Sequence, residues 1–365
     1  MLGKRIQRAR KALGLSLRDL GDQIALSHAA IKKYEDDEVT PSSDVLIKLG
    51  KALHVRVEYF FRPERFTLEN IHYRKHADMP ERHLEEITAK ILDQLERRVE
   101  LENLFPTPPV QSFLVKNLPK KINHIDEVEK LANQIRNQWS LGFDPTPDLI
   151  DIFEEQGIKI FGIDNEQYPK IDGLYAEVNG MPVVVVGDQR PGDRQRFTLA
   201  HELGHLLLDN RLEDGLDIES CCNRFAGAFL LPKQSLVNVL GEHRTSIEPR
   251  ELSLLKQEFG ISMTSILHRL EETGIISSHV YRQLRAEFNE RGWSKKEPGE
   301  QYPKEITHIF EQMIFHALAE QYIGESKAAE LMNMPLESFR SLRAMGSCTY
   351  FLSTDEGCWQ SVAVG

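Results

Sequence analysis

Apolar residues recur at helical spacing along most of this chain. Near the amino terminus, Gly14 and two serines divide that pattern into short amphipathic segments. It predicts helices at 4–13, after Ser16 to about residue 24, and after Ser27 to about residue 35, because serine is well suited to cap a helix. Another apolar segment follows Pro41, so this part of the chain is predicted to be all-α.

A longer helix is predicted over 81–102, where apolar residues form one stripe. The stripe is short for a coiled coil, so we favour packing inside the chain over a dimer helix, and both interpretations stay open. A Pro-rich segment at 105–113 then reads as a linker. The stripe consists of Ile87, Ile91, Leu95 and Val99.

The helical pattern breaks between 158 and 187, where three short apolar runs predict strands. The runs are IKIFGI, GLYAEV and PVVVVG. Beyond them the period is helical again. The expected fold is therefore mainly α with a small β-sheet. Further helices are predicted at 248–259, 262–274, 278–291 and 308–324.

These changes of pattern divide the chain into five parts. The predicted parts are an all-α helix-turn-helix domain (1–66), a helical connector with the Pro-rich linker (67–113), an α+β domain (114–240), a helical C-terminal region (241–344) and a poorly ordered tail (345–365).

The strongest chemical signal is His201-Glu202-x-x-His205 inside an apolar helical run. Residues four apart share a helix face, so both imidazoles can reach one metal ion. Glu202 is placed to exchange a proton with water activated there. In a chain with 13 His this spacing can arise by chance. The surrounding leucines and Gly204 nevertheless favour a metal-binding helix that packs closely on a neighbouring element.

A zinc site of this type needs a third protein ligand. Glu219, at the polar start of the next apolar helix, is the favoured candidate, with one Zn²⁺ expected per chain. Asn223 lies one turn later and can orient a ligand from the second shell. Three other acidic residues compete for the ligand role, namely Glu213, Asp214 and Asp217.

The segments RFTLAHELGHLLL and IESCCNRFAGAFLLP together resemble the ImmA/IrrE family of metallopeptidases. The resemblance implies a zincin-like domain in which His201, His205 and Glu219 hold the metal and Glu202 is the general acid/base. Cys221 and Cys222 depart from the family pattern. Adjacent helical residues point about 100 degrees apart, so both cannot face one ion, and we favour inert packing over a regulatory thiol or a thiolate ligand.

The first 66 residues are similar to the Cro/C1 class of repressors. The resemblance implies that the helix beginning after Ser27 enters the major groove of double-stranded DNA. This region holds 13 Lys plus Arg against 9 Asp plus Glu, whereas the whole chain has a net charge of −11. The candidate DNA contacts are Ser16, Arg18, Ser27, His28, Ala29, Lys32 and Lys33.

Composition points to a cytoplasmic protein without a membrane role. The chain has 365 residues, 41% of them hydrophobic, and four cysteines, too few for a disulfide scaffold. We find no apolar stretch that could span a bilayer and no signal peptide. We therefore expect a reducing compartment.

These features predict a DNA-binding transcriptional regulator with a zinc endopeptidase domain that cleaves a repressor or other regulatory protein in a stress or mobile-element response. A palindromic operator and a homodimer are expected from the DNA-binding class. The main alternative is a ligand-sensing transcription factor whose peptidase-like domain is non-catalytic. A third possibility, an antitoxin-like repressor, has no partner signal in the sequence.

Overall fold

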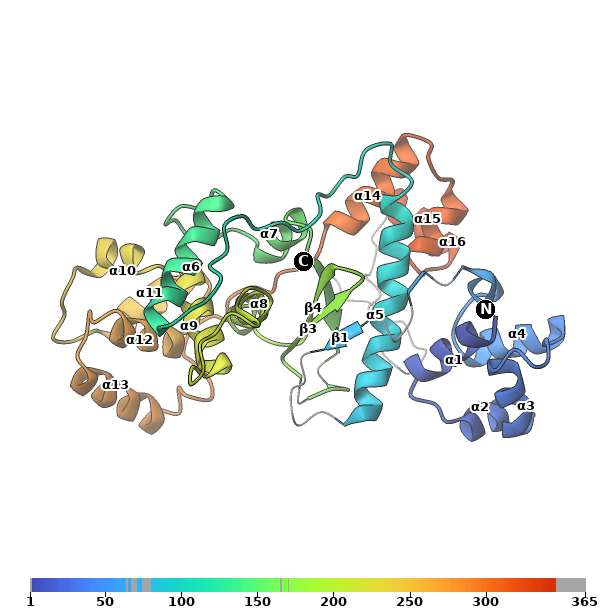
Figure 1. Ribbon diagram of the computed structural model, residues 1–365, viewed down its shortest axis with the longest axis horizontal. Helices are drawn as coiled ribbons and strands as arrows, with labels where there is room; N and C mark the ends of the chain where they lie inside the picture. Colours follow the sequence, from blue (N-terminus) through green and yellow to red (C-terminus); the bar gives the residue numbers. More distant parts are fainter. Residues whose placement is uncertain are drawn as a thin grey trace. The chain divides into compact units, whose positions relative to one another are not determined.

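The structure is a computed structural model that describes residues 2–63, 65–66, 71–73, 80–164, 166–169 and 171–345. Figure 1 shows its helices and strands, and by its internal contacts the chain divides into two compact units. The first comprises Met1–Leu92 and Gln111–Thr307, and the second comprises Asp93–Val110 and His308–Gly365. The boundary falls within helix α5 (Glu81–Glu102). The tail from 346, with Cys348 and Cys358, lies outside the described residues, as does most of the segment between 67 and 79.

The N-terminal helices form where the sequence predicts them. Ser16 caps α2 through a reciprocal capping box with Asp19, and the Ser27 hydroxyl accepts a hydrogen bond from the Ala30 amide at the start of α3. Ile6, Leu20 and other buried apolar side chains fill a separate small core. The elements are α1 (Leu2–Ala12), α2 (Leu17–Ile24), α3 (His28–Glu35), α4 (Ser43–Ala52) and a 3-10 helix at Val57–Phe61.

A four-stranded sheet with the order β1-β3-β4-β2 forms one layer of the first unit. β3 and β4 make an antiparallel hairpin whose turn, Asn179-Gly180, has positive φ at both residues, a geometry that these two residue types favour. β2 pairs parallel to β4, and β1 pairs antiparallel to β3. The strands are β1 (Ile71–Tyr73), β2 (Lys159–Ile163), β3 (Gly173–Val178) and β4 (Met181–Gly187). The sequence predicted three of them and assigned β1 to the connector.

Helices pack on the sheet and on one another to form the main core, confirming the mainly α fold with a small sheet. The largest helix contact joins α8 (Gly192–Leu208) and α9 (Ile218–Leu230), and α8 also contacts β3 and β4. The remaining helices of this unit are α6 (Ile125–Gln138), α7 (Leu149–Glu155), α10 (Lys233–Leu240), α11 (Pro249–Phe259), α12 (Met263–Glu272) and α13 (Ser278–Glu290).

Buried ion pairs fix the helices that surround the α8–α9 pair. Glu129 of α6 accepts from both Arg224 of α9 and Arg269 of α12, at 2.8 and 3.0 Å. Glu272 completes the group by pairing with both arginines. Because a buried charge without a partner is costly, this group fixes the relative position of three helices.

The second unit has its own small core. It is built by the C-terminal part of α5 together with α14 (Ile309–Ala319), α15 (Glu325–Leu331) and α16 (Leu336–Arg343). α14 ends earlier than the predicted 308–324, at Ala319, because Gln321 takes a positive φ of 61° and stops the helix. Throughout the described ranges, each helix is too short or too polar to cross a lipid bilayer.

Candidate metal centre

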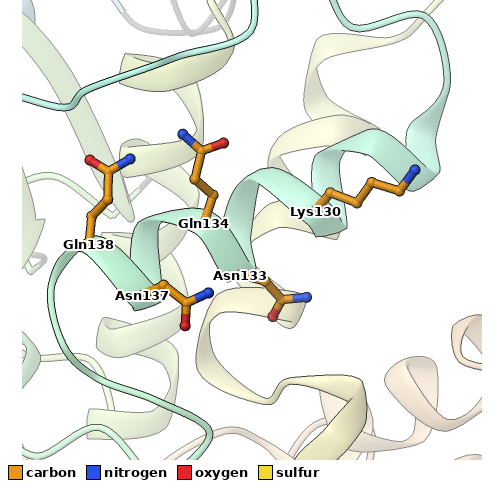
Figure 2. Close-up of a pocket in the computed structure, with 5 residues that line it drawn as sticks. All are labelled: Lys130, Asn133, Gln134, Asn137 and Gln138. Carbon is orange, nitrogen blue, oxygen red and sulfur yellow. The ribbon is translucent and has the colours of Figure 1, made fainter.

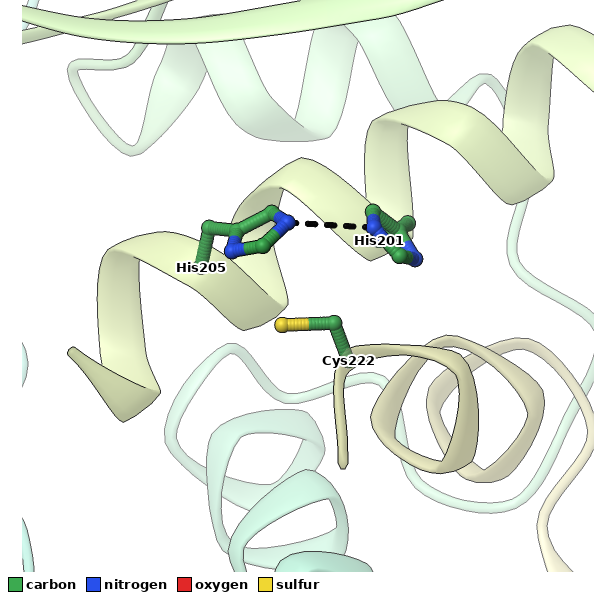
Figure 3. Close-up of side chains that lie close together, drawn as sticks. All are labelled: His201, His205 and Cys222. Atoms are coloured by element: carbon green, nitrogen blue, oxygen red, sulfur yellow. Dashed lines mark hydrogen bonds between the residues drawn. The ribbon is translucent and has the colours of Figure 1, made fainter. Parts of the chain in front are cut away.

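Helix α8 presents two histidines on the face that packs toward α9. His201 and His205 are one turn apart, and their Nε2 atoms lie 3.1 Å from each other (Figure 3). Their side chains are 13% and 7% exposed, so both imidazoles are largely buried but still accessible to solvent. The predicted spacing therefore does bring both imidazoles to one point.

Glu219, in the first turn of α9, completes the cluster. One carboxylate oxygen lies 3.2 Å from His201 Nε2 and the other lies 3.4 Å from His205 Nε2. Two of the three competing acidic residues are used elsewhere. Asp217 caps α9 by accepting from Ser220, which also lowers the pKa of the Asp217 carboxyl, and Glu213 pairs with Lys121. The position favoured from sequence is thus the one that faces the histidines.

The distances among these donors fit a tetrahedral metal. With zinc–nitrogen bonds of 2.0–2.1 Å, ligand atoms on a tetrahedron lie roughly 3.3–3.4 Å apart. The three separations between His201, His205 and Glu219 are 3.1, 3.2 and 3.4 Å. Two imidazole nitrogens and a carboxylate are also a ligand set that zinc prefers, and three ligands leave one position open.

Asn223 orients the first histidine. Its side-chain oxygen lies 3.0 Å from His201 Nδ1, where it can accept the Nδ1–H hydrogen bond. That bond selects the tautomer whose Nε2 carries a free lone pair, the form that binds a metal. The helical spacing from Glu219 to Asn223 thus supplies one residue beside the metal position and one that acts through His201.

The side chain of Glu202, on α8, lies against the start of β3. It is 2% exposed. An ideal Cβ built on Gly173 would fall 2.9 Å from Glu202 Oε1 and 2.3 Å from Thr198 Cγ2, so only glycine fits there. The absence of a side chain at Gly173 lets β3 approach the acid beside His201, a contact that sequence reasoning missed.

Cys222 packs directly beneath the histidines. Its Sγ and the ring nitrogens of His201 and His205 all lie within 4.8 Å of one another (Figure 3). Both Cys221 and Cys222 are buried in the main core, as the packing interpretation predicts. An ideal Cβ on Gly204 would lie 3.1 Å from Cys222 Cα and 3.3 Å from its Sγ, which explains the glycine.

Three polar residues in and near α8 and β3 have side chains that can donate to an oxyanion, and two of them are engaged elsewhere. Arg196 is fully buried and holds Glu305 and Thr146, while Arg194 pairs with Asp172 at 2.5 Å. Tyr175 is a buried β3 residue of the main core. None of these contacts involves the histidine cluster.

The candidate DNA contacts are all exposed residues of the N-terminal domain. Ser16 and Ser27 also serve as helix caps, and Lys32 pairs with Asp36 at 2.7 Å. Three arginines of α1, namely Arg5, Arg8 and Arg10, are buried and bonded inside the domain, so they add little to its phosphate-binding surface. The exposed candidates are Ser16, Arg18, Ser27, His28, Ala29, Lys32 and Lys33.

A shallow depression of about 520 Å³ lies away from the cluster, along α6 (Figure 2). Its lining is polar, and Gln134 and Gln138 both donate to the Lys116 carbonyl in the neighbouring segment. No histidine or carboxylate contributes to it. The lining residues are Lys130, Asn133, Gln134, Asn137 and Gln138.

Comparisons with known proteins support both motifs. Residues 153–271 match the IrrE N-terminal-like domain, and residues 6–60 match a helix-turn-helix domain. A stretch of 103 residues is 36% identical to the radiation response metalloprotease IrrE of Deinococcus deserti, covering 25% of this chain and 36% of that protein. A stretch of the same length is 34% identical to the protein of that name from Deinococcus radiodurans, covering 25% of this chain and 31% of that protein. The match therefore spans about a third of each relative.

Among solved structures, Bacillus thuringiensis PlcR in complex with the peptide PapR7 and DNA aligns over 94% of this chain and 95% of that chain, with 11% identity and a TM-score of 0.17. So low a score carries no argument about either fold or function. The two domain matches carry the conclusion instead: this chain joins a helix-turn-helix domain to an IrrE N-terminal-like domain.

Proposed function

We propose that this protein is a DNA-binding regulator whose zinc-dependent endopeptidase cleaves a repressor or other regulatory protein in a stress or mobile-element response. The convergence of His201, His205 and Glu219, with 3.1–3.4 Å between their ligand atoms, carries the proposal. One Zn²⁺ per chain fits this set. The relatives named radiation response metalloprotease support the same chemistry.

Each residue has a distinct task in peptide hydrolysis. His201, His205 and Glu219 hold the metal, which when bound acidifies water and polarises the scissile carbonyl. Glu202 accepts the proton from the attacking water and passes it to the departing amine, because it follows His201 directly on α8 and is largely shielded from solvent. Asn223 keeps His201 in the metal-binding tautomer.

Two variants test this assignment in sequence. Protein purified without chelator should contain close to one zinc per chain, and His201→Ala should lose it. Glu202→Gln should keep the zinc and the fold but abolish cleavage and derepression. If Glu202→Gln regulates normally while binding zinc, the ligand-sensing regulator replaces the peptidase, since that alternative needs no proton transfer.

The amino-terminal domain is proposed to bind a palindromic DNA operator as a homodimer. The N-terminal end of α3 is exposed, so His28 and Ala29 can face base edges, while Lys33 can approach a phosphate. Lys33→Ala should weaken binding to all DNA sequences and lower the slope of log affinity against log salt concentration by about one. His28→Ala should instead weaken binding mainly to the operator sequence. Lys130→Ala, on α6, is the charge-matched control.

A further inference from the structure

The two imidazoles of the metal cluster have a third neighbour besides Glu219. Cys222 Sγ and one ring nitrogen from each of His201 and His205 lie within 4.8 Å of one another, an arrangement that could hold a metal ion (Figure 3). These three donors come from α8 and α9, the two helices with the largest mutual contact. The same imidazoles are therefore close to two different kinds of donor, a carboxylate and a thiol.

The packing of the two helices determines where this thiol lies. Cys222 is fully buried, and its sulfur lies against the backbone of α8 at Gly204, where an ideal Cβ would fall 3.3 Å from Sγ. Gly204 directly precedes His205, so the absence of a side chain there admits the sulfur beside the histidine pair. Cys221 is buried as well, but among the described residues no group of metal-ligand atoms includes it. Nearness to the imidazoles therefore distinguishes Cys222 from its neighbour in sequence.

The set of donors with sulfur is looser than the set with oxygen. The ligand atoms of His201, His205 and Glu219 are 3.1–3.4 Å apart, which fits zinc. The atoms of the set with Cys222 are held only within 4.8 Å of one another. Around a tetrahedral zinc ion, nitrogen and sulfur ligands lie roughly 3.5 Å apart. A larger ion with longer bonds can therefore use the sulfur with less movement of the two helices.

Thiolate is a soft ligand that favours soft, polarisable ions, whereas carboxylate favours hard ones. We propose that His201, His205 and Cys222 form a soft-metal site for ions such as Cd²⁺, the larger and softer congener of Zn²⁺, with the thiol releasing its proton to solvent as the sulfur binds. Glu219 is close enough to be a fourth donor, and four protein ligands leave a tetrahedral ion no position for water. The inference rests on the metal site of the proposed function and assigns to that site a class of inhibitory ion.

Absorption spectroscopy with cadmium alone tests this without requiring cleavage. Thiolate bound to Cd²⁺ gives a near-ultraviolet charge-transfer band that imidazole and carboxylate ligands do not give. The parent is the full-length chain with Cys348→Ser/Cys358→Ser, which removes the two thiols of the tail. It is titrated metal-free with cadmium chloride under a reductant that contains no thiol. We expect the band in this parent and, as the matched control, in Cys221→Ala, and no band in Cys222→Ala.

Comparison of the two metals separates the two ligand sets. Cys222→Ala should bind cadmium at least tenfold more weakly than the parent, while its zinc affinity stays within about threefold, because zinc uses the carboxylate. Glu219→Ala should show the reverse pattern, with most zinc lost and the cadmium band retained.

Further measurements keep the result independent of folding and of catalysis. Should Cys222→Ala unfold by circular dichroism, Cys222→Ser has nearly the same volume and takes its place, and cadmium NMR of the parent reports a sulfur ligand without any substitution at the site. A parent without the band, or a band that persists in a folded Cys222 variant, would overturn the soft-metal site. The zinc content of the same parent decides separately whether the proposed peptidase site stands.

Discussion

Replacing Asn223 by Ala should weaken zinc binding without unfolding the protein. The amide oxygen of Asn223 accepts from His201 Nδ1 at 3.0 Å, and the residue is exposed on α9. Without this acceptor, His201 can rotate and can place its proton on Nε2, the atom that faces His205 and Glu219. Loss of such a partner usually weakens metal affinity by roughly 10–100-fold, or about 1.4–2.7 kcal/mol.

The metal-free protein should hardly change. A hydrogen bond of this kind contributes about 0.5–1.5 kcal/mol net, and Ala offsets part of the loss because it is the better helix former. The stability difference between the variant and the parent should therefore grow by about 1.4–2.7 kcal/mol when free zinc well exceeds both dissociation constants, since a ligand stabilises by RT ln(1 + [L]/Kd).

Competition against a zinc chelator of known affinity measures the dissociation constant, and thermal unfolding in zinc-buffered and chelator-treated solutions measures the linked stability. Asn223→Asp retains an acceptor for the His201 proton and should bind zinc more tightly than Asn223→Ala. Asn137→Ala removes an exposed amide from α6 and should match the parent. A zinc affinity within twofold of the parent for Asn223→Ala would refute the role given to Asn223.

Three further predictions concern the framework and the third ligand. Gly204→Ala places a Cβ 3.1 Å from the Cys222 backbone. We expect this overpacking to lower the free energy of unfolding by about 1–3 kcal/mol, partly offset by the higher helix propensity of Ala. Zinc affinity should also fall, because the added methyl group pushes α9 and its Glu219 away from α8; denaturant unfolding and chelator titrations measure the two effects. For Glu129, burial raises the carboxyl pKa but Arg269 and Arg224 outweigh it, so the folded pKa lies below the ordinary 4.5. The stabilisation is present above about pH 4.5 and is lost as pH falls through the folded pKa. Glu129→Gln should therefore cost about 1–3 kcal/mol at pH 7 and progressively less in acid, and a pH-independent difference in unfolding free energy would contradict this. Glu219→Ala should lose most bound zinc by elemental analysis while the α-helical circular dichroism persists, whereas full zinc retention would exclude Glu219 as a ligand.

The parts of the site that the sequence predicts are those set by helix periodicity. A four-residue spacing on α8 and on α9 fixes which side chains share a face, so the positions of His201, His205, Glu219 and Asn223 follow once the two helices are known to pack together. The capping serines likewise fix the starts of α2 and α3 through local hydrogen bonds. Local rules are sufficient in both cases.

Contacts between residues far apart in sequence were not predictable in this way. Arg196 lies only five residues before His201, but it bonds Glu305, more than one hundred residues away in the sequence. Cys222 was assigned to packing, which its burial supports, yet its nearness to both imidazoles depends on the close approach permitted by Gly204. β1 is too short for a periodic signal, and its pairing partner determines that it is a strand.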